Sequence, residues 1–199
     1  MMKKLLALVL ALMMLALPAL AETATQTVTA PAGGYSVEVP AGWLSLNANI
    51  VKQMYADDDL RAMIGQNLGM ADPSMLAQYV SVMEQSNMVM VYADDMIGNF
   101  NVQTAPMPLT MEQVVSVKGM MDMTMAQQYV ALGAPEESIR TMEIQQIGGR
   151  SWYGMQLELA GLDVLMLMTV VDNMQYVFTF GGIDLETCYA IVETFTLTE

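Results

Sequence analysis

The densest apolar run after the first 21 residues is Val164–Val171, which is apolar at nearly every position. A strand of this composition needs cover on both faces, so the run predicts an inner strand of a sheet. The preceding segment Trp152–Leu159 alternates instead, with Gln156 and Glu158 on one side and apolar residues on the other. This pattern predicts a strand with one drier face. Gln175–Phe180 follows and is expected to run back antiparallel to the apolar run.

Further signals complete the predicted sheet. The dipeptide Asp172-Asn173 is a two-residue turn candidate, because both residue types tolerate positive φ. Tyr35–Val39 alternates as a strand, after which Trp43 is expected to pack back onto the sheet. Met88–Tyr92 and Phe100–Thr104 predict a hairpin around residues 94–99.

Helix start signals precede four segments of helical periodicity. They are Asp57–Asp59 before a short helix ending at Gly69, Asp72-Pro73 before a second helix, the capping box Thr110–Gln113 before a long helix from Met111 to about Leu132, and Asp184 before a last helix. Gly133 is expected to end the long helix. Together the elements predict one α+β domain, an antiparallel sheet of about six or seven strands with helices on both faces, which is an α/β/α sandwich.

The first 21 residues read as a secretory signal peptide. Lys3 and Lys4 precede the apolar run Leu5–Leu17, and Ala19-Leu20-Ala21 is a small-x-small cleavage site. We therefore expect cleavage after Ala21 and a secreted or extracytoplasmic product that is soluble. Residues 22–33 are rich in Thr, Ala and Pro and are expected to form a flexible leader, with the domain spanning residues 34–199.

The charge balance limits the classes of partner. Two of the seven basic residues lie in the signal peptide, so five remain against 21 acidic residues and the mature chain has a net charge of −16. Such a surface repels phosphate backbones and anionic lipids, which argues against nucleic acid or membrane binding and favours a basic partner or dissolved cations.

The residues needed for familiar catalytic chemistry are few. The chain has no histidine, which removes the commonest general base and metal ligand. Its single cysteine, Cys188, lies on an apolar helix face and is expected to be an unreactive thiol. Gly149-Arg-Ser151-Trp-Tyr153 departs from the nucleophile-elbow pattern and enters a strand. A pair of carboxylates acting on a glycosidic bond stays open, but the expectation is a protein that is no enzyme and needs no cofactor.

The predicted elements begin with the strand Tyr35–Val39, the following Pro40-Ala-Gly42-Trp43 and the hairpin. They continue with the long helix and with Ile147–Arg150, which leads into the antiparallel strands and the last helix. Taken together, this series of elements resembles the PsbP/Mog1-like domain family. The resemblance covers about Gly34 to Thr198. It implies an α/β/α sandwich, and it places the chain beside small exported bacterial proteins without assigned activity. Because better-known members are accessory or binding domains, it implies a noncatalytic role.

The leading hypothesis is a binding or accessory domain of unknown partner. Loops and element ends carry recognition more often than a packed sheet does. The candidate partner-binding residues are therefore the acidic groups predicted at a helix start and a hairpin tip: Asp57, Asp58, Asp59, Asp94 and Asp95. Helix capping and turn formation also explain these residues without any partner.

The alternative hypothesis is an extracytoplasmic metal-binding protein. The chain holds 23 methionines, and thioethers favour Cu(I). The pairs Met88/Met90, Met121/Met125 and Met166/Met168 each share one face of a strand or helix, and the clustered carboxylates are the other candidate ligands. Periodicity assigns the same methionines to the interior, so core filling is the expected role and no metal site is predicted.

Overall fold

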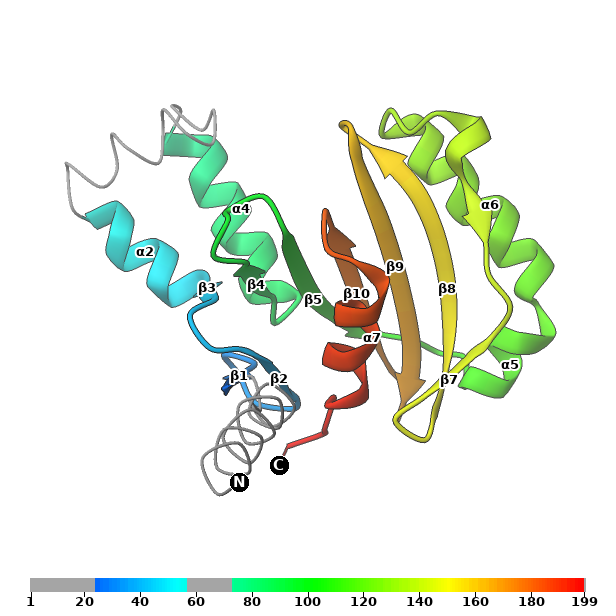
Figure 1. The fold of residues 1–199 in the computed structure, drawn as a ribbon, viewed down its shortest axis with the longest axis horizontal. Helices are drawn as coiled ribbons and strands as arrows, with labels where there is room; N and C mark the ends of the chain where they lie inside the picture. Colours follow the sequence, from blue (N-terminus) through cyan, green and yellow to red (C-terminus); the bar gives the residue numbers. More distant parts are fainter. Residues whose placement is uncertain (1–23, 57–72, 199) are drawn as a thin grey trace, which may run out of the picture.

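The computed structural model describes residues 24–56 and 73–198, and its strands form two sheets (Figure 1). The larger sheet has eight antiparallel strands in the order β3-β4-β5-β10-β9-β8-β6, with β7 paired to β8. Its strands are β3 (Leu44–Asn47), β4 (Val89–Tyr92), β5 (Asn99–Pro106), β6 (Arg140–Thr141), β7 (Gln145–Ile147), β8 (Arg150–Leu159), β9 (Leu162–Val171) and β10 (Met174–Gly181). The smaller sheet pairs β1 (Thr25–Thr29) with β2 (Ser36–Pro40).

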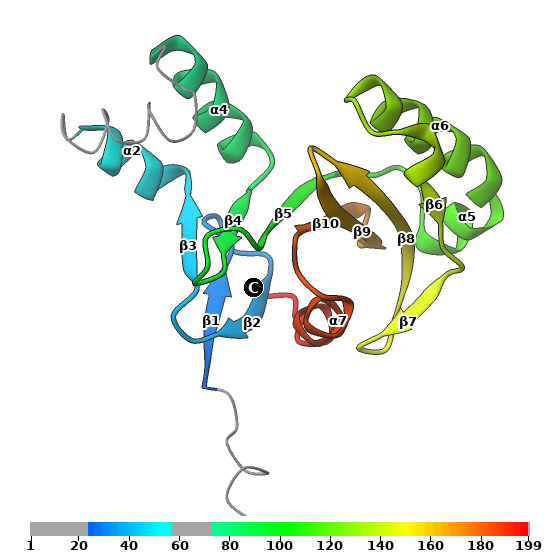
Figure 2. The ribbon, with the colours of Figure 1, turned by 45° about the horizontal axis from the view of Figure 1, so that its top comes forward.

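Helices cover both faces of the larger sheet, which confirms the predicted α+β fold class (Figure 2). The helices are α2 (Ala48–Ala56), α4 (Pro73–Gln85), α5 (Met111–Ser116), α6 (Lys118–Ala131), α7 (Leu185–Glu193) and the short 3-10 helix η1 (Glu136–Ser138). α7 and the smaller sheet cover one face, whereas α2, α4, α5 and α6 cover the other.

The face under α7 holds an aromatic core. Phe178 packs edge-on against Trp152 and Phe195, with ring centroids 5.5 and 5.6 Å apart. Leu165 and Leu167 of β9 join this core, whereas their neighbours Met166 and Met168 point to the opposite face. β9 is therefore buried on both sides, as its apolar run predicts.

The opposite face holds a cluster of seven methionines beneath α5 and α6. Met155 and Met166 are direct cross-strand partners on β8 and β9. The cluster consists of the buried Met155, Met166 and Met168 and the partly buried Met107, Met111, Met121 and Met125. We call it the methionine cluster. A flexible thioether fills irregular space between a helix and a sheet well, so packing accounts for these residues.

Two tight turns fix the register of the last three strands. Asp172 and Asn173 have φ values of 50° and 61°, so the predicted turn between β9 and β10 is confirmed. Ala160 and Gly161 adopt φ values of 53° and 79° between β8 and β9. Positive φ at both central residues gives a twist that matches the flanking strands.

The expected flexible leader is wrong for residues 25–29. These residues form β1, which pairs with β2 along its whole length, and Val28 is buried in the aromatic core. The alternation of threonine with one apolar residue suits a strand that has a single buried side chain. The partner strand β2 lies beyond a turn, so the composition of residues 25–29 alone does not reveal that they pair with it.

The expected long helix is two helices. α5 ends at Ser116, and Val117 takes φ −107° and ψ 16° before α6 begins at Lys118. The predicted capping box at Thr110 and Gln113 is present at the start of α5, and Gly133 ends α6 with φ 99°. β3 and α2, which had no sequence signal, fill the segment before residue 57.

Candidate functional site

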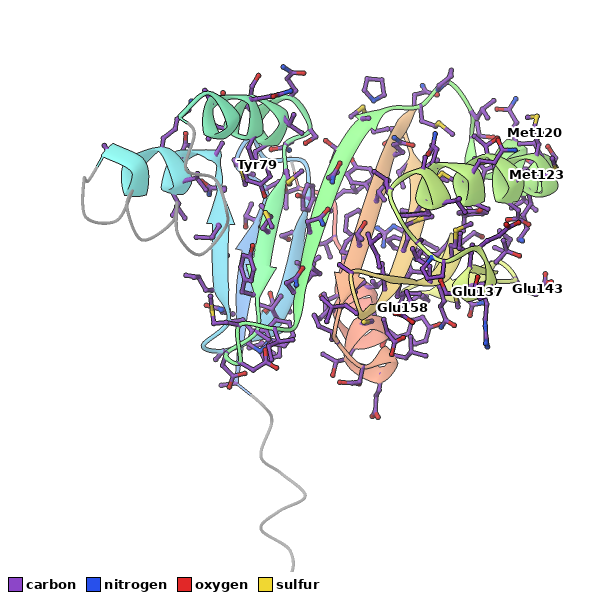
Figure 3. All side chains as sticks on the ribbon, turned by 90° about the horizontal axis from the view of Figure 1, so that it is seen from above. Tyr79, Met120, Met123, Glu137, Glu143 and Glu158 are labelled. Carbon is purple, nitrogen blue, oxygen red and sulfur yellow. The ribbon has the colours of Figure 1, made fainter. Side chains whose placement is uncertain are left out.

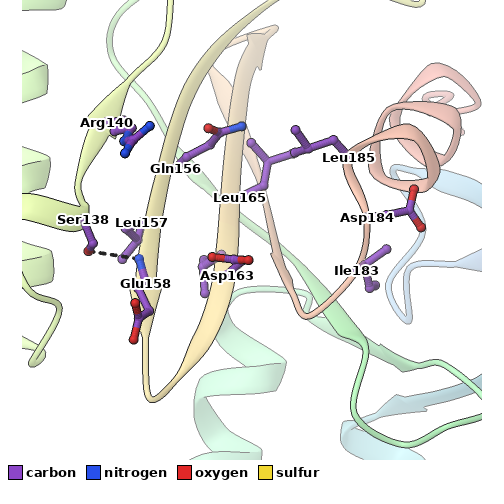
Figure 4. A pocket seen from close by; sticks show the side chains of 11 residues that line it. Ser138, Arg140, Gln156, Leu157, Glu158, Asp163, Leu165, Ile183, Asp184 and Leu185 are labelled. Atoms are coloured by element: carbon purple, nitrogen blue, oxygen red, sulfur yellow. Dashed lines mark hydrogen bonds between the residues drawn. The ribbon is translucent and has the colours of Figure 1, made fainter.

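A pocket of about 570 Å³ lies at the N-terminal end of α7, over the ends of β8 and β9 (Figure 4). Its lining combines apolar side chains with carboxylates. The apolar part includes Leu165, the half-buried Ile183 and Leu185, which is 46% exposed. A concave site with a few converging polar groups is the usual form of a ligand site.

The hairpin between β8 and β9 places two carboxylates side by side in this pocket. Glu158 and Asp163 are direct cross-strand partners, so their side chains share one face of the sheet. Both are exposed and both line the pocket. Like charges that lie directly opposite each other across a ladder disfavour strand pairing in general.

Asp184 contributes a third carboxylate to the pocket and is also the N-cap of α7. Its carboxylate accepts hydrogen bonds from the backbone N–H and the hydroxyl of Thr187, at 2.9 and 2.8 Å. The backbone hydrogen bond is the larger cause that lowers the pKa of Asp184 below its usual value. The group is therefore ionised at neutral pH, and the sequence prediction of a cap is confirmed.

Arg140 lies beside β8, across the pocket from Asp184 (Figure 4). It is the single basic residue among the described side chains that line the pocket, and its cross-strand partner is Gln156. Ser138 of η1 fixes the neighbouring strand, because its hydroxyl accepts a 3.1 Å hydrogen bond from the backbone N–H of Glu158. The pocket lining thus holds three carboxylates, from Glu158, Asp163 and Asp184, and one guanidinium, from Arg140 at the β8 edge (Figure 4).

The predicted acidic hairpin tip lies beside this pocket. Asp94 and Asp95 are exposed in the turn between β4 and β5, and the Asp95 carboxylate accepts hydrogen bonds from the N–H groups of Ile97 and Gly98. These hydrogen bonds lower the pKa of Asp95. A Cβ on Gly98 would lie only 3.2 Å from Cγ1 of Ile183, so the turn packs closely against the pocket lining.

The other three predicted residues, Asp57, Asp58 and Asp59, lie outside the described residues. Their role as partner-binding residues therefore stays a prediction.

The paired methionines lie in packed clusters. Met88 and Met90 pack with α2 and α4, and the other two predicted pairs belong to the methionine cluster. Within residues 24–56 and 73–198, no group of three or more His, Cys, Asp or Glu side chains is arranged to hold a metal ion. These positions favour packing over ligation as the role of the sulfurs.

The two nucleophile candidates lie in different surroundings. Cys188 is fully buried, and burial raises the pKa of its thiol to about 12. Ser151 accepts a 2.8 Å hydrogen bond from the side-chain amide of Gln146, which is no base. Neither environment activates a nucleophile.

No helix within residues 24–56 and 73–198 is long and apolar enough to cross a bilayer.

The sequence analysis missed Glu158 and Asp163 as a pair. Glu158 was assigned to the more polar side of its strand, but the residue register between this strand and the apolar strand Val164–Val171 was not predicted. The signal was present in Ala160-Gly161, because a two-residue turn there makes residues 158 and 163 partners.

Comparisons with known proteins find similarity at the level of solved structures. No family model matches the chain, and no curated protein matches it in sequence. The solution structure of cyanobacterial PsbP (CyanoP) from Synechocystis sp. PCC 6803 aligns with a TM-score of 0.45 and 13% identity, over 89% of this chain and 95% of that chain. A crystal structure from Bacteroides thetaiotaomicron aligns with a TM-score of 0.43 and 12% identity, over 87% of this chain and 48% of that chain. Both alignments have low sequence identity, and the similarity concerns the fold alone.

Proposed function

We propose that this chain is an exported, noncatalytic binding domain that takes a lysine or arginine side chain of a partner into the pocket at the start of α7. The observation that carries the proposal is the cross-strand pair Glu158 and Asp163 at the edge of that pocket. Two adjacent carboxylates repel each other when the pocket is empty, and an ammonium or guanidinium group between them removes that repulsion.

The chemistry of the lining supports a basic side chain as the ligand. Ionised carboxylates form short, charge-assisted hydrogen bonds with ammonium and guanidinium donors. Ile183 and Leu185 offer apolar surface beside them, which suits the methylene stem that such side chains keep along apolar surface. The pocket volume of about 570 Å³ lies within the common range for small ligand sites.

The charge of the whole chain supports the same class of partner. A net charge of −14 for the full sequence attracts basic proteins and raises their association rate. The signal peptide predicted at the N-terminus supports an exported location. The absence of histidine and the buried state of Cys188 support a noncatalytic role.

A binding titration with a defined probe tests the proposal. The probe is a short peptide with blocked ends and one central lysine, measured by calorimetry against the wild-type chain and the variant Glu158→Gln with Asp163→Asn. Loss of two charge-assisted contacts is expected to weaken binding by about tenfold or more. The control is Glu143→Gln, which removes an exposed carboxylate between β6 and β7 and is expected to leave the affinity unchanged (Figure 3).

Arg140 provides a test with the opposite sign. Because its guanidinium repels a cationic ligand, Arg140→Gln is expected to strengthen binding of the lysine peptide by a few-fold. Equal affinities for the wild-type chain, the double variant and Arg140→Gln would contradict the proposed site.

A further inference from the structure

The outer side of α6 exposes an apolar stripe. Met120 is 65% exposed and Met123 is 66% exposed, and Val130 is exposed about two turns further along. Figure 3 shows both methionines on the side of α6 that faces away from the sheet. Together with Gln127, the three residues follow each other at intervals of three, four and three positions. This is the spacing at which one helix packs along another.

Packing within the fold does not use this stripe. The opposite side of α6 supplies Met121 and Met125 to the methionine cluster, and Tyr129 packs in the same core. A helix with one apolar side toward the core and polar residues elsewhere is the usual surface helix. α6 departs from that pattern because its outer side is apolar as well.

The exposed side of α6 also lacks charge. Lys118 and Asp122 are the charged residues between positions 118 and 132, and they pair with each other at 2.8 Å. Their side chains are only 20% and 21% exposed. The exposed neighbours of the stripe are uncharged residues such as Thr124 and Gln128.

These features point to a second copy of the same chain as the occupant. Two mature copies with a net charge of −16 each repel one another over acidic surfaces, and the repulsion is weakest where neutral surfaces meet. α6 offers 14 residues, or about 21 Å, of such a surface. An antiparallel arrangement about a two-fold axis would place the same stripe on both sides of the contact.

We propose that the chain forms a homodimer through α6, with the helices antiparallel. Met120 of one copy then packs near Val130 of the other, and Met123 and Gln127 lie near the two-fold axis. Gln127 is a polar residue at a seam position, which is the kind of residue that fixes register in paired helices. The contact is independent of the pocket at α7.

Sedimentation equilibrium of the chain without residues 1–21 tests the proposal. The expected result is a reversible monomer–dimer equilibrium between about 1 µM and about 1 mM protein. Dimerisation is expected to strengthen between about 0.05 M and about 0.5 M salt, since salt screens the repulsion between two acidic copies. A monomer throughout this range, or a dimer that salt weakens, would overturn the proposal.

A pair of charge variants locates the interface. Met123→Glu places a carboxylate in the stripe and is expected to weaken dimerisation at least tenfold, whereas Gln128→Glu adds the same charge about 140° away around the helix and is expected to leave it nearly unchanged. Both positions are exposed, and matching thermal unfolding curves check that both variants fold. Equal effects of the two variants would overturn the proposed interface. Binding to phosphatidylcholine vesicles without any dimer in solution would also overturn it and assign the stripe to a lipid surface.

Discussion

Lys118 and Asp122 form an ion pair one turn apart on α6, with 2.8 Å between Nζ and Oδ2. The pair lies against the sheet, because the Lys118 nitrogen is 5.8 Å from the ring centre of the buried Tyr153. The second oxygen of Asp122, Oδ1, is buried and has no hydrogen-bond partner among the residues that the structure describes. The pair therefore holds α6 to the sheet from a partly desolvated position.

We expect Asp122→Asn to destabilise the fold by about 1–3 kcal/mol, because it leaves the partly buried Lys118 without its counter-charge. The exposed pair Lys52 and Glu84 provides the comparison, since its side chains are about half exposed. Glu84→Gln is expected to cost less than about 1 kcal/mol. Urea unfolding of both variants measures the difference, and equal costs would show that the Lys118 pair is effectively solvated.

Gly154 and Gly119 are expected to respond to alanine with opposite signs. A Cβ on Gly154 would lie 3.0 Å from the sulfur of Met142 and 3.1 Å from Cδ2 of Leu167, so Gly154→Ala overpacks β8 and is expected to cost about 1–3 kcal/mol. Gly119 lies in α6, and a Cβ added there would have open space around it. Gly119→Ala is therefore expected to stabilise the fold by about 0.4–1 kcal/mol. Thermal unfolding measures both changes, and a stabilised Gly154→Ala variant would contradict the close packing of β8 against Met142.

Buried tyrosines make the fold sensitive to alkaline pH. Burial raises the pKa of Tyr79 from 10.0 to about 12, and burial also raises the pKa of Tyr35. A raised pKa in the folded state gives stability that is complete below the unfolded value and is lost as pH rises toward the folded value. We expect the free energy of unfolding to fall between about pH 10 and pH 12, with a shallower fall in Tyr79→Phe. Denaturant curves across this range test the expectation, which a flat profile would refute.

The thiol of Cys188 is expected to react slowly in the native state. It is fully buried, and its raised pKa of about 12 leaves little thiolate at neutral pH. Labelling with a thiol reagent should therefore require unfolding, and the labelling rate should rise with denaturant along the unfolding transition. Rapid labelling of the folded chain would place α7 differently from the structure.

The central part of the fold could be predicted because its signals are local. The apolar run of β9, the turn at Asp172-Asn173 and the capping box at Thr110 each depend on a few adjacent residues. The break at Val117 was harder to predict, because no proline marks it. It falls among Val114, Val115 and Val117, whose branched side chains lower helix propensity, and just before Gly119, which lowers it further.

The candidate site could be predicted only in part, because it depends on which strands are neighbours. Asp184 was found as a helix cap from local sequence. Glu158 and Asp163 become a pair through the register of β8 and β9, and Arg140 joins them because β6 pairs with β8. Such non-local pairings are set by the packing of the whole sheet, which single residues do not reveal.

The most direct test of a binding site at α7 is an amide chemical-shift titration of the chain with the blocked lysine peptide. The account predicts that the shifts of Glu158, Asp163 and the Ile183–Leu185 segment change first and saturate together, and that the changes shrink as salt is added. In the variant Glu158→Gln with Asp163→Asn these changes should be lost. Saturating shifts confined to other parts of the chain, with the pocket residues unmoved, would contradict the account.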